Sequence, residues 1–306
     1  MRSFERFIGG EWRMTVASGT SMFDRWSWGP GRHSVRVMTD GQAADGRPWR
    51  ELQTFYWHPE RKQIALLGLS PFANGVSEGT IAFEGERAEA ILDLYQSGGL
   101  RRMQLQWSFQ DPNRYREALL ERIGSGGYEP LTEWTHIRAD TSEAGLRAAE
   151  KVPPPSGSLR PLGALLGHRW EGSALHAGAD SIRLESTFEW VPYANGIYER
   201  IVTLSADGAA THRIDAYIYH HTGRGVLRAL ALSAQGGVYE GDGSIDDTGA
   251  LVFDLQGYEG DQRVLYRARL DLEPDGSLRR RVWRLVGGTH VAVFDVRFPQ
   301  AASRKR

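Results

Sequence analysis

The feature that most constrains the fold of this chain is an internal duplication. Three pairs of segments correspond in order, namely Phe7-Ile-Gly-Gly-Glu-Trp12 with Leu165-Leu-Gly-His-Arg-Trp170, Phe55-Tyr-Trp-His58 with Ile218-Tyr-His-His221, and Ile137-Arg138 with Val296-Arg297. The offset is 158 residues for the first pair, 163 for the second and 159 for the third. Matches in the same order at near-constant spacing indicate two copies of one domain.

A proline-rich stretch separates the two copies. Lys151-Val-Pro-Pro-Pro-Ser-Gly-Ser-Leu159 combines an extended triproline with a flexible Ser-Gly-Ser. Residues 141–150 before it are compatible with a short helix that begins at Thr141 or Ser142. The chain is therefore expected to divide into a first domain at 1–140, a helix and linker at 141–160, a second domain at 161–300 and a tail at 301–306.

Each half is expected to be built from short β-strands. Glycine accounts for 36 of 306 residues without a collagen-like period, which indicates many tight turns. Residues 115–123 could form a capped helix, but the matching segment of the second half is typical of a strand, so we predict a strand there too. Eight to ten short strands in about 140 residues indicate an antiparallel sandwich or closed barrel.

The motif that opens each half favours a barrel. Gly-x-x-Trp at Gly9–Trp12 and its fuller form, Leu166-Gly-His-Arg-Trp-Glu-Gly172, resemble the opening of the calycin barrels, which include lipocalins, fatty-acid-binding proteins and nitrobindin-like proteins. The second half is similar to bacterial lipocalin-like domains of unknown function. The resemblance implies an all-β fold of two tandem antiparallel calycin/lipocalin-like β-barrels.

The same resemblance implies how each barrel is closed. In such barrels the tryptophan of the first strand packs under an arginine of the last strand. Carried onto this sequence, the pairs are Trp12 with Arg138 and Trp170 with Arg297, each a favourable cation–π geometry.

Strand alternation then predicts polar groups inside the barrels. If Arg138 points inward, Trp134 and His136 share its face, and an inward Arg297 places Asp295 inward as well. Buried polar groups need partners. The candidate partners on neighbouring strands are Arg36, Tyr56, Arg200 and Tyr219. These residues could bind a ligand or form an internal hydrogen-bond network without one, and the sequence leaves both open.

Three functions remain compatible with these residues. The first is non-catalytic binding of a small apolar or aromatic ligand in one or both barrels, with the alternative that one barrel is purely structural. The second is haem binding of the nitrobindin type, with His136 or His290 as the iron ligand; otherwise no cofactor is expected. The third is an isomerase- or hydratase-like enzyme on a lipid, terpenoid or polyketide, with acid–base groups drawn from His136, Asp295, Glu78 and Glu240.

The composition of the chain limits the kinds of partner and the cellular compartment that we expect. A net charge of −1 argues against a nucleic-acid binder. The chain has no cysteine, which fits a reducing compartment, and no apolar run long enough for a signal sequence or membrane span. We therefore expect a cytoplasmic protein whose partner is a small apolar molecule, while the oligomeric state stays open.

The histidines do not predict a metal site. His212 and His220 share a strand face but lie roughly 26 Å apart, too far to bind one ion. His58 and His221 begin matching turns, where we expect solvated hairpin corners.

Overall fold

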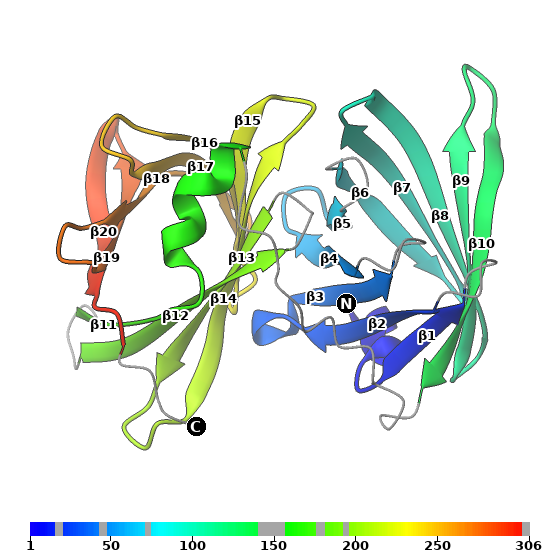
Figure 1. Ribbon diagram of the computed structural model, residues 1–306, viewed down its shortest axis with the longest axis horizontal. Coiled ribbons are helices and arrows are strands. Elements are labelled where there is room, and N and C mark those ends of the chain that lie inside the picture. The colour runs from blue at the N-terminus through cyan, green and yellow to red at the C-terminus, as the bar shows by residue number, and fades with distance from the viewer. Residues whose placement is uncertain are drawn as a thin grey trace.

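The computed structural model describes residues 1–15, 21–42, 48–70, 75–139, 157–175, 181–191 and 196–301. Figure 1 shows two β-barrels side by side, one from each half of the chain. This all-β architecture of two ten-stranded antiparallel barrels fits a calycin-like fold and confirms the predicted fold class. The helix expected over residues 141–150 lies outside the described residues. Within the described ranges, no helix is long and apolar enough to cross a membrane.

The first barrel is closed. Its strands are β1 (Glu11–Thr15), β2 (Ser21–Trp28), β3 (Ser34–Gln42), β4 (Pro48–His58), β5 (Gln63–Ser70), β6 (Gly75–Glu84), β7 (Arg87–Gln96), β8 (Gly99–Asp111), β9 (Arg114–Arg122) and β10 (Tyr128–Ala139). Each strand pairs with its neighbour in sequence, and β1 also pairs with β10 to complete the circle. The strand predicted over residues 115–123 is β9.

The second barrel repeats this order and is nearly closed. Its strands are β11 (Arg169–Leu175), β12 (Ser181–Val191), β13 (Gly196–Leu204), β14 (Ala210–His221), β15 (Val226–Ser233), β16 (Val238–Ile245), β17 (Leu251–Glu259), β18 (Gln262–Leu272), β19 (Leu278–Val286) and β20 (Thr289–Phe298). A single bridge between Trp170 and Gln300 joins its two edges, supported by a hydrogen bond from the Ala301 N–H to the Arg169 carbonyl at 2.8 Å.

A short 3-10 helix plugs one end of each barrel. Helix η1 (Arg2–Phe7) precedes β1, and helix η5 (Gly157–Leu165) precedes β11. Their apolar side chains are buried in the barrel cores. The first-strand tryptophans hold the plugs: the Trp12 indole donates to the Phe7 carbonyl at 3.1 Å, and the Trp170 indole donates to the Leu165 carbonyl at 3.2 Å.

A third apolar core joins the two barrels. It is formed mainly by the outward faces of β4, β5 and β6 in the first barrel and of β14, β15 and β16 in the second. Strand β5 is consequently buried on both faces, with Leu66 in the first barrel's core and Leu67 in the shared core. Helix η2 (Pro30–Arg32) adds to the contact, since a Cβ atom on Gly31 would lie only 2.0 Å from the Ala234 carbonyl oxygen.

Candidate functional site

An arginine on a tryptophan closes the plugged end of the first barrel. Arg138 stands opposite Trp12 in the β1–β10 pairing, and its guanidinium lies 4.5 Å from the centre of the Trp12 ring. The guanidinium also donates to the Arg6 carbonyl at 2.5 Å, which ties β10 to helix η1. The contact that the resemblance implies for this half is therefore present.

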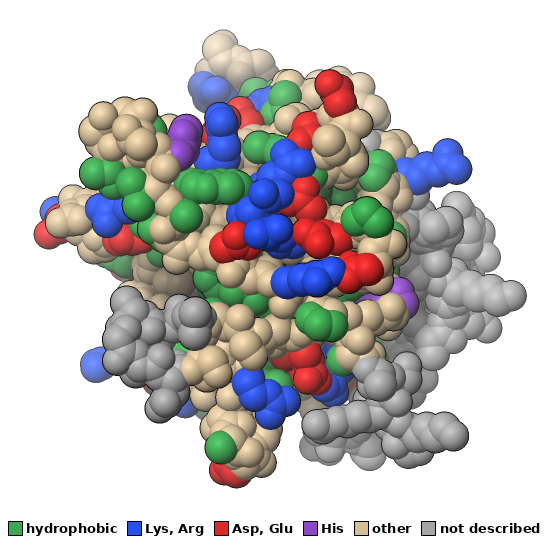
Figure 2. Space-filling model, turned by 90° about the vertical axis from the view of Figure 1, so that its left-hand side faces the viewer, with side chains coloured by type: hydrophobic (Ala, Val, Ile, Leu, Met, Phe, Trp, Pro, Cys, Tyr) green, Lys and Arg blue, Asp and Glu red, His purple; other side chains and the backbone are tan. Residues whose placement is uncertain are grey.

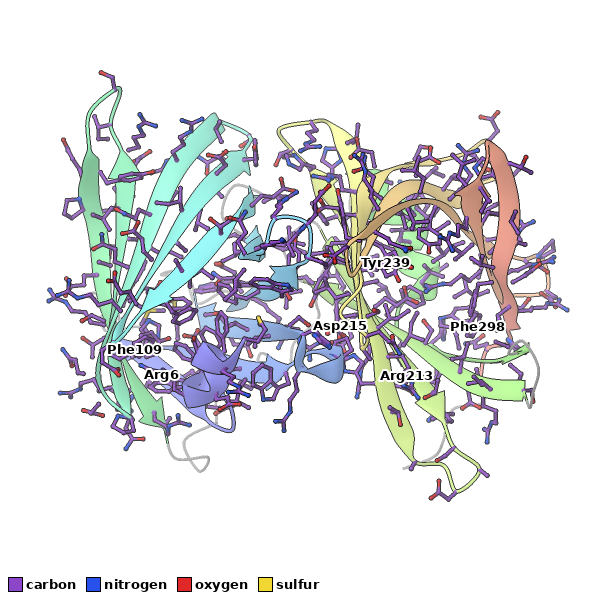
Figure 3. All side chains as sticks on the ribbon, turned by 180° about the vertical axis from the view of Figure 1, so that it is seen from behind. Arg6, Phe109, Arg213, Asp215, Tyr239 and Phe298 are labelled. Atoms are coloured by element: carbon purple, nitrogen blue, oxygen red, sulfur yellow. The ribbon has the colours of Figure 1, made fainter. Side chains whose placement is uncertain are left out.

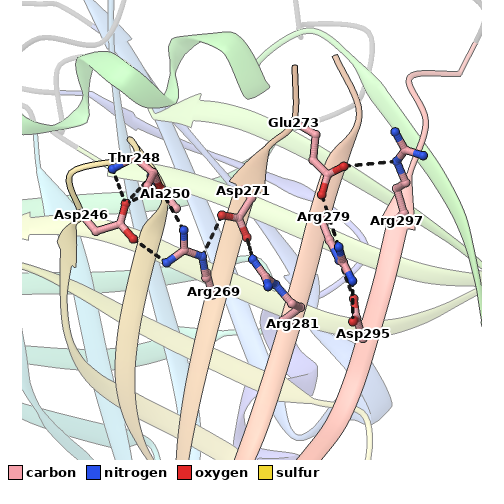
Figure 4. Close-up of polar contacts among 10 residues, drawn as sticks. All are labelled: Asp246, Thr248, Ala250, Arg269, Asp271, Glu273, Arg279, Arg281, Asp295 and Arg297. Carbon is pink, nitrogen blue, oxygen red and sulfur yellow. Dashed lines mark hydrogen bonds and ion pairs between the residues drawn. The ribbon is translucent and has the colours of Figure 1, made fainter. Parts of the chain in front are cut away.

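The corresponding prediction for the second barrel is wrong. Arg297 lies on the outer face of β20, where it pairs with Asp275 and with Glu273, the latter drawn in Figure 4. Gln300, rather than Arg297, stands opposite Trp170. Arg138 and Arg297 look equivalent in the sequence but do not occupy equivalent positions in the two barrels. Strand alternation on β20 places Val296 and Phe298, not Arg297, inside the second barrel.

Asp295 is also outside the second barrel. It shares the outer face with Arg297 and accepts two hydrogen bonds of 2.9 Å from Arg279 (Figure 4). Figure 2 looks onto this side of the molecule and shows acidic and basic side chains interleaved. Exposed ion pairs of this kind add little stability, and Asp295 cannot line the lumen that the sequence assigned to it.

The first barrel encloses a cavity of about 540 Å³. Aromatic and aliphatic side chains form most of its wall. Polar side chains on the wall include two cross-strand rows, namely Asp24–Thr39–Glu51 on β2 to β4 and Trp107–Glu117–Trp134 on β8 to β10. Each row follows from strand pairing, because residues directly opposite on neighbouring strands point to the same face.

His136 lies at the wall between these rows and is buried, as its strand parity predicts. Its Nδ1 is 3.0 Å from Asp24 and 2.9 Å from the Tyr115 hydroxyl, and its Nε2 is 3.4 Å from Glu117. Burial would lower the pKa of His136, but the nearby carboxylates of Asp24 and Glu117 raise that pKa to about 9. The ring is therefore an imidazolium at neutral pH.

Glu51 faces the same cavity, and none of the basic residues that the structure describes forms an ion pair with it. Its carboxylate accepts hydrogen bonds from Gln53 at 2.7 Å and from Ser70 at 3.3 Å. Burial raises the pKa of Glu51 to about 7, helped by the negative charges of Glu117 and Asp24. Glu51 thus changes its charge near neutral pH.

The second barrel encloses a smaller cavity, of about 380 Å³, with a mostly apolar wall. The polar cluster of the first barrel can be compared with the second barrel by aligning the strand pairs around Trp12 and Trp170. In this alignment Phe298 stands in the place of His136, Leu278 in that of Tyr115, Ser186 in that of Asp24 and Arg280 in that of Glu117. Phe298 is labelled in Figure 3. Arg280 pairs with Glu199, to which Ser186 donates at 2.6 Å, so these charges balance each other.

Four other predicted ligand-binding residues do not line either cavity. Tyr56 and Tyr219 are buried in the core between the barrels, and the Arg36 guanidinium lies 4.3 Å from the Tyr198 ring across the same interface. Arg200 is exposed on β13. The expectation that these four side chains point into a barrel is wrong. On each of their strands, it is the residues of the opposite face that point into the barrel.

Glu78 and Glu240, the two glutamates proposed as acid–base groups, also lie in the interface between the barrels. Glu78 of the first barrel accepts hydrogen bonds from Tyr219 at 3.1 Å and from Arg228 at 3.0 Å in the second. Glu240 of the second barrel accepts one from Arg61 at 2.9 Å in the first. Both glutamates lie at the junction of the barrels, away from the residues that line the two cavities.

The paired turn histidines complete this interface. His58 Nε2 is 3.6 Å from Glu240, and His221 Nε2 is 3.6 Å from Glu78. Each ring also packs on a tyrosine of the other barrel, with 4.6 Å between the centroids of His58 and Tyr258. Both histidines are fully buried, so the expectation of solvated hairpin corners is wrong.

The two histidines considered for haem differ in setting. His290 is exposed at the start of β20. His136 lines the first cavity, but the proton that its raised pKa retains at neutral pH would compete with iron for the ring nitrogen. His136 therefore does not fit a haem ligand in this arrangement.

Sequence reasoning found Trp134 and His136 but missed Asp24, Glu51, Tyr115 and Glu117. A signal for some of them was present. Glu51 alternates with Gln53 and the core residue Phe55, and Asp24 alternates with Trp26, so inward parity could have been extended along β2 and β4.

No protein-family model matches the chain, and no curated protein matches it. Among solved structures, the chain is similar to a protein of unknown function from the DUF3598 family of Nostoc punctiforme, with 14% identity over 97% of each chain and a TM-score of 0.22. At that TM-score the similarity supports no conclusion about fold or function.

Proposed function

We propose that the lumen of the first barrel binds a small apolar or aromatic molecule without transforming it. Its volume of about 540 Å³ lies within the range of small-ligand sites. Such sites combine an apolar wall with a few convergent polar groups, as this lumen does.

The difference between the two lumens carries this proposal. Asp24, Glu117 and His136 gather at the wall of one cavity, while the matching positions of the other hold an apolar side chain or a balanced ion pair. A polar cluster that served only the fold would have the same use in both copies. Its restriction to the larger cavity supports a ligand there.

A neutral fluorescent probe tests the proposal. N-phenyl-1-naphthylamine is expected to brighten on binding to the protein. Ser77→Phe, which fills the first cavity, should remove this signal, while the matched variant Ala231→Phe in the second cavity should retain it. A signal that survives Ser77→Phe and disappears with Ala231→Phe would move the site to the second barrel, and no signal at all would overturn the proposal.

One observation favours a second candidate, an isomerase- or hydratase-like enzyme. A carboxyl group with a pKa of about 7, as Glu51 has, can both accept and donate a proton at neutral pH. If the barrel is an enzyme, Glu51→Gln should abolish turnover of a bound substrate that the variant still binds. Retained turnover would exclude Glu51 as the acid–base group.

We infer the wider setting from the sequence. The Gly-x-x-Trp motifs support placement among tandem lipocalin-like domains, and the absence of cysteine supports a role in the cytoplasm. Neither inference depends on the identity of the ligand.

A further inference from the structure

The first lumen carries more negative than positive charge. Three carboxylates line it, Asp24, Glu51 and Glu117, against one imidazolium, His136. Arg101 also lines the cavity, but both ends of its guanidinium bond to Glu121 at 2.6 Å, which balances its charge. Among the described residues that line the lumen, acidic groups therefore outnumber the basic groups that can neutralise them.

Glu51 is the clearest of these groups. Its hydrogen-bond partners, Gln53 and Ser70, are neutral, and in the part of the chain that the structure describes no basic residue forms an ion pair with it. A carboxylate that is largely removed from water and has no cation beside it is costly. A positive group on a bound molecule would remove that cost.

Glu117 also retains capacity to accept a hydrogen bond. The Nε2 atom of buried His136 faces it at 3.4 Å but makes no hydrogen bond. The Trp107 indole donates to the same carboxylate oxygen at 2.9 Å. One oxygen, Oε2, therefore takes both contacts, and among the described residues the other oxygen has no hydrogen-bond donor.

The wall of the cavity suits a cation in a second, independent way. Four indoles line it, those of Trp26, Trp49, Trp107 and Trp134, although one face of the Trp26 ring is already stacked on Phe7. The face of an indole is the most favourable aromatic surface for a positive charge, and such surfaces form the sites that bind organic ammonium groups.

We propose that the ligand of the first barrel is an organic cation, an amine or quaternary ammonium group on a small aromatic or alkyl body. The cationic group lies near Glu51 and Glu117, and the apolar body packs against the indoles. This inference rests on the proposed function, since it names the ligand class of the same lumen. The second lumen lacks the feature, because Arg280 occupies the position of Glu117 and pairs with Glu199.

Three indole compounds that differ only in their head group test the proposal. Tryptamine is cationic, tryptophol is neutral and indole-3-acetate is anionic, and each is titrated against bound N-phenyl-1-naphthylamine. Tryptamine should displace the probe at a concentration at least about tenfold below that of tryptophol, with indole-3-acetate the weakest. In Glu51→Gln the advantage should shrink to about threefold or less, while the exposed control Glu89→Gln keeps it.

The outcomes separate the two proposals. If the probe binds but the three compounds displace it equally, or the carboxylate is best, the cation inference is overturned and the ligand-binding proposal stands. If tryptamine is preferred but Glu51→Gln leaves the preference intact, the charge at Glu51 is not its source, which also overturns the inference. If the probe does not bind at all, the ligand-binding proposal itself fails.

Discussion

Glu51→Gln should stabilise the empty protein increasingly as the pH rises. The pKa of Glu51 is about 7 in the fold against an ordinary value of 4.5, because burial opposes its charge. Between these values the folded chain holds a proton that the unfolded chain has released, so stability falls as the pH increases. Glutamine keeps the shape and hydrogen bonds of a neutral Glu51 and is indifferent to pH.

The magnitude follows from the difference between the two pKa values. A difference of about 2.5 corresponds to about 3.5 kcal/mol, since each pKa unit is worth about 1.4 kcal/mol. The gain in unfolding free energy of Glu51→Gln over the wild type should therefore be close to zero below about pH 4.5 and approach about 3.5 kcal/mol above about pH 7.

Urea unfolding followed by circular dichroism, from about pH 5 to about pH 8, measures this difference. Glu89→Gln serves as the control, because its side chain is exposed on β7 and meets water in both states. A constant difference between wild type and Glu51→Gln across that range would refute the reasoning, as would an equal pH dependence in Glu89→Gln.

Three further outcomes are expected. His136→Gln should lower the free energy of unfolding by about 3 kcal/mol near pH 6, because it leaves the buried carboxylate of Asp24 and the partly buried carboxylate of Glu117 without their cation. The wild type should lose this advantage as the pH rises through about 9, which urea unfolding at several pH values checks. Arg138→Ala should lower the free energy of unfolding by about 1–3 kcal/mol, because it removes the contact with the Trp12 ring and the hydrogen bond to the Arg6 carbonyl. Arg297→Ala on the outer face should change the free energy of unfolding by less than about 0.5 kcal/mol. Equal losses of the two variants in thermal unfolding would contradict this difference. Burial would raise the pKa of Glu78, but its basic neighbours lower that pKa to about 2. The contribution of Glu78 to the free energy of unfolding should therefore be complete above about pH 4.5 and disappear toward about pH 2. An acid titration in which the stability of Glu78→Gln parallels that of the wild type would disprove this.

The repeat, the glycine-rich turns and the resemblance of the Gly-x-x-Trp motif to calycin barrels together predicted the two barrels. Two copies of a strand-rich domain with matching first-strand tryptophans leave few alternatives, and parity on β10 placed His136 correctly beside Trp134. Because side chains alternate between the two faces of a strand, one correctly placed residue is enough to predict which face its neighbours on that strand occupy.

The failures have two physical causes. The first is a register error: similar letters at Arg138 and Arg297 do not occupy equivalent positions, and a bulge in β20 near Val293 alters the pairing further. The second is that alternation separates the two faces of a strand without saying what covers the outer one. Tyr56 and Tyr219 were assigned to a lumen because strand alternation alone does not show that the outer faces of the two barrels pack against each other.

One signal of that second surface was available. The run Ala65–Leu69 is almost continuously apolar, which is typical of a strand buried on both faces rather than of a barrel wall in contact with water. The matching run Ala229–Leu232 has the same character. Two such runs at equivalent positions would have indicated that the copies pack against each other.

The reciprocity of the barrel–barrel contact has a consequence for the origin of the chain. His58 meets Glu240 as His221 meets Glu78, so each half carries both sides of the same bond. A surface that carries both sides is self-complementary, which is the defining property of a two-fold homodimer. A single-barrel ancestor would have paired with itself through this surface, with identical lumens by symmetry. Duplication and fusion of such a gene would remove that symmetry, and each lumen could then change without the other, consistent with the charged and apolar lumens of the present chain.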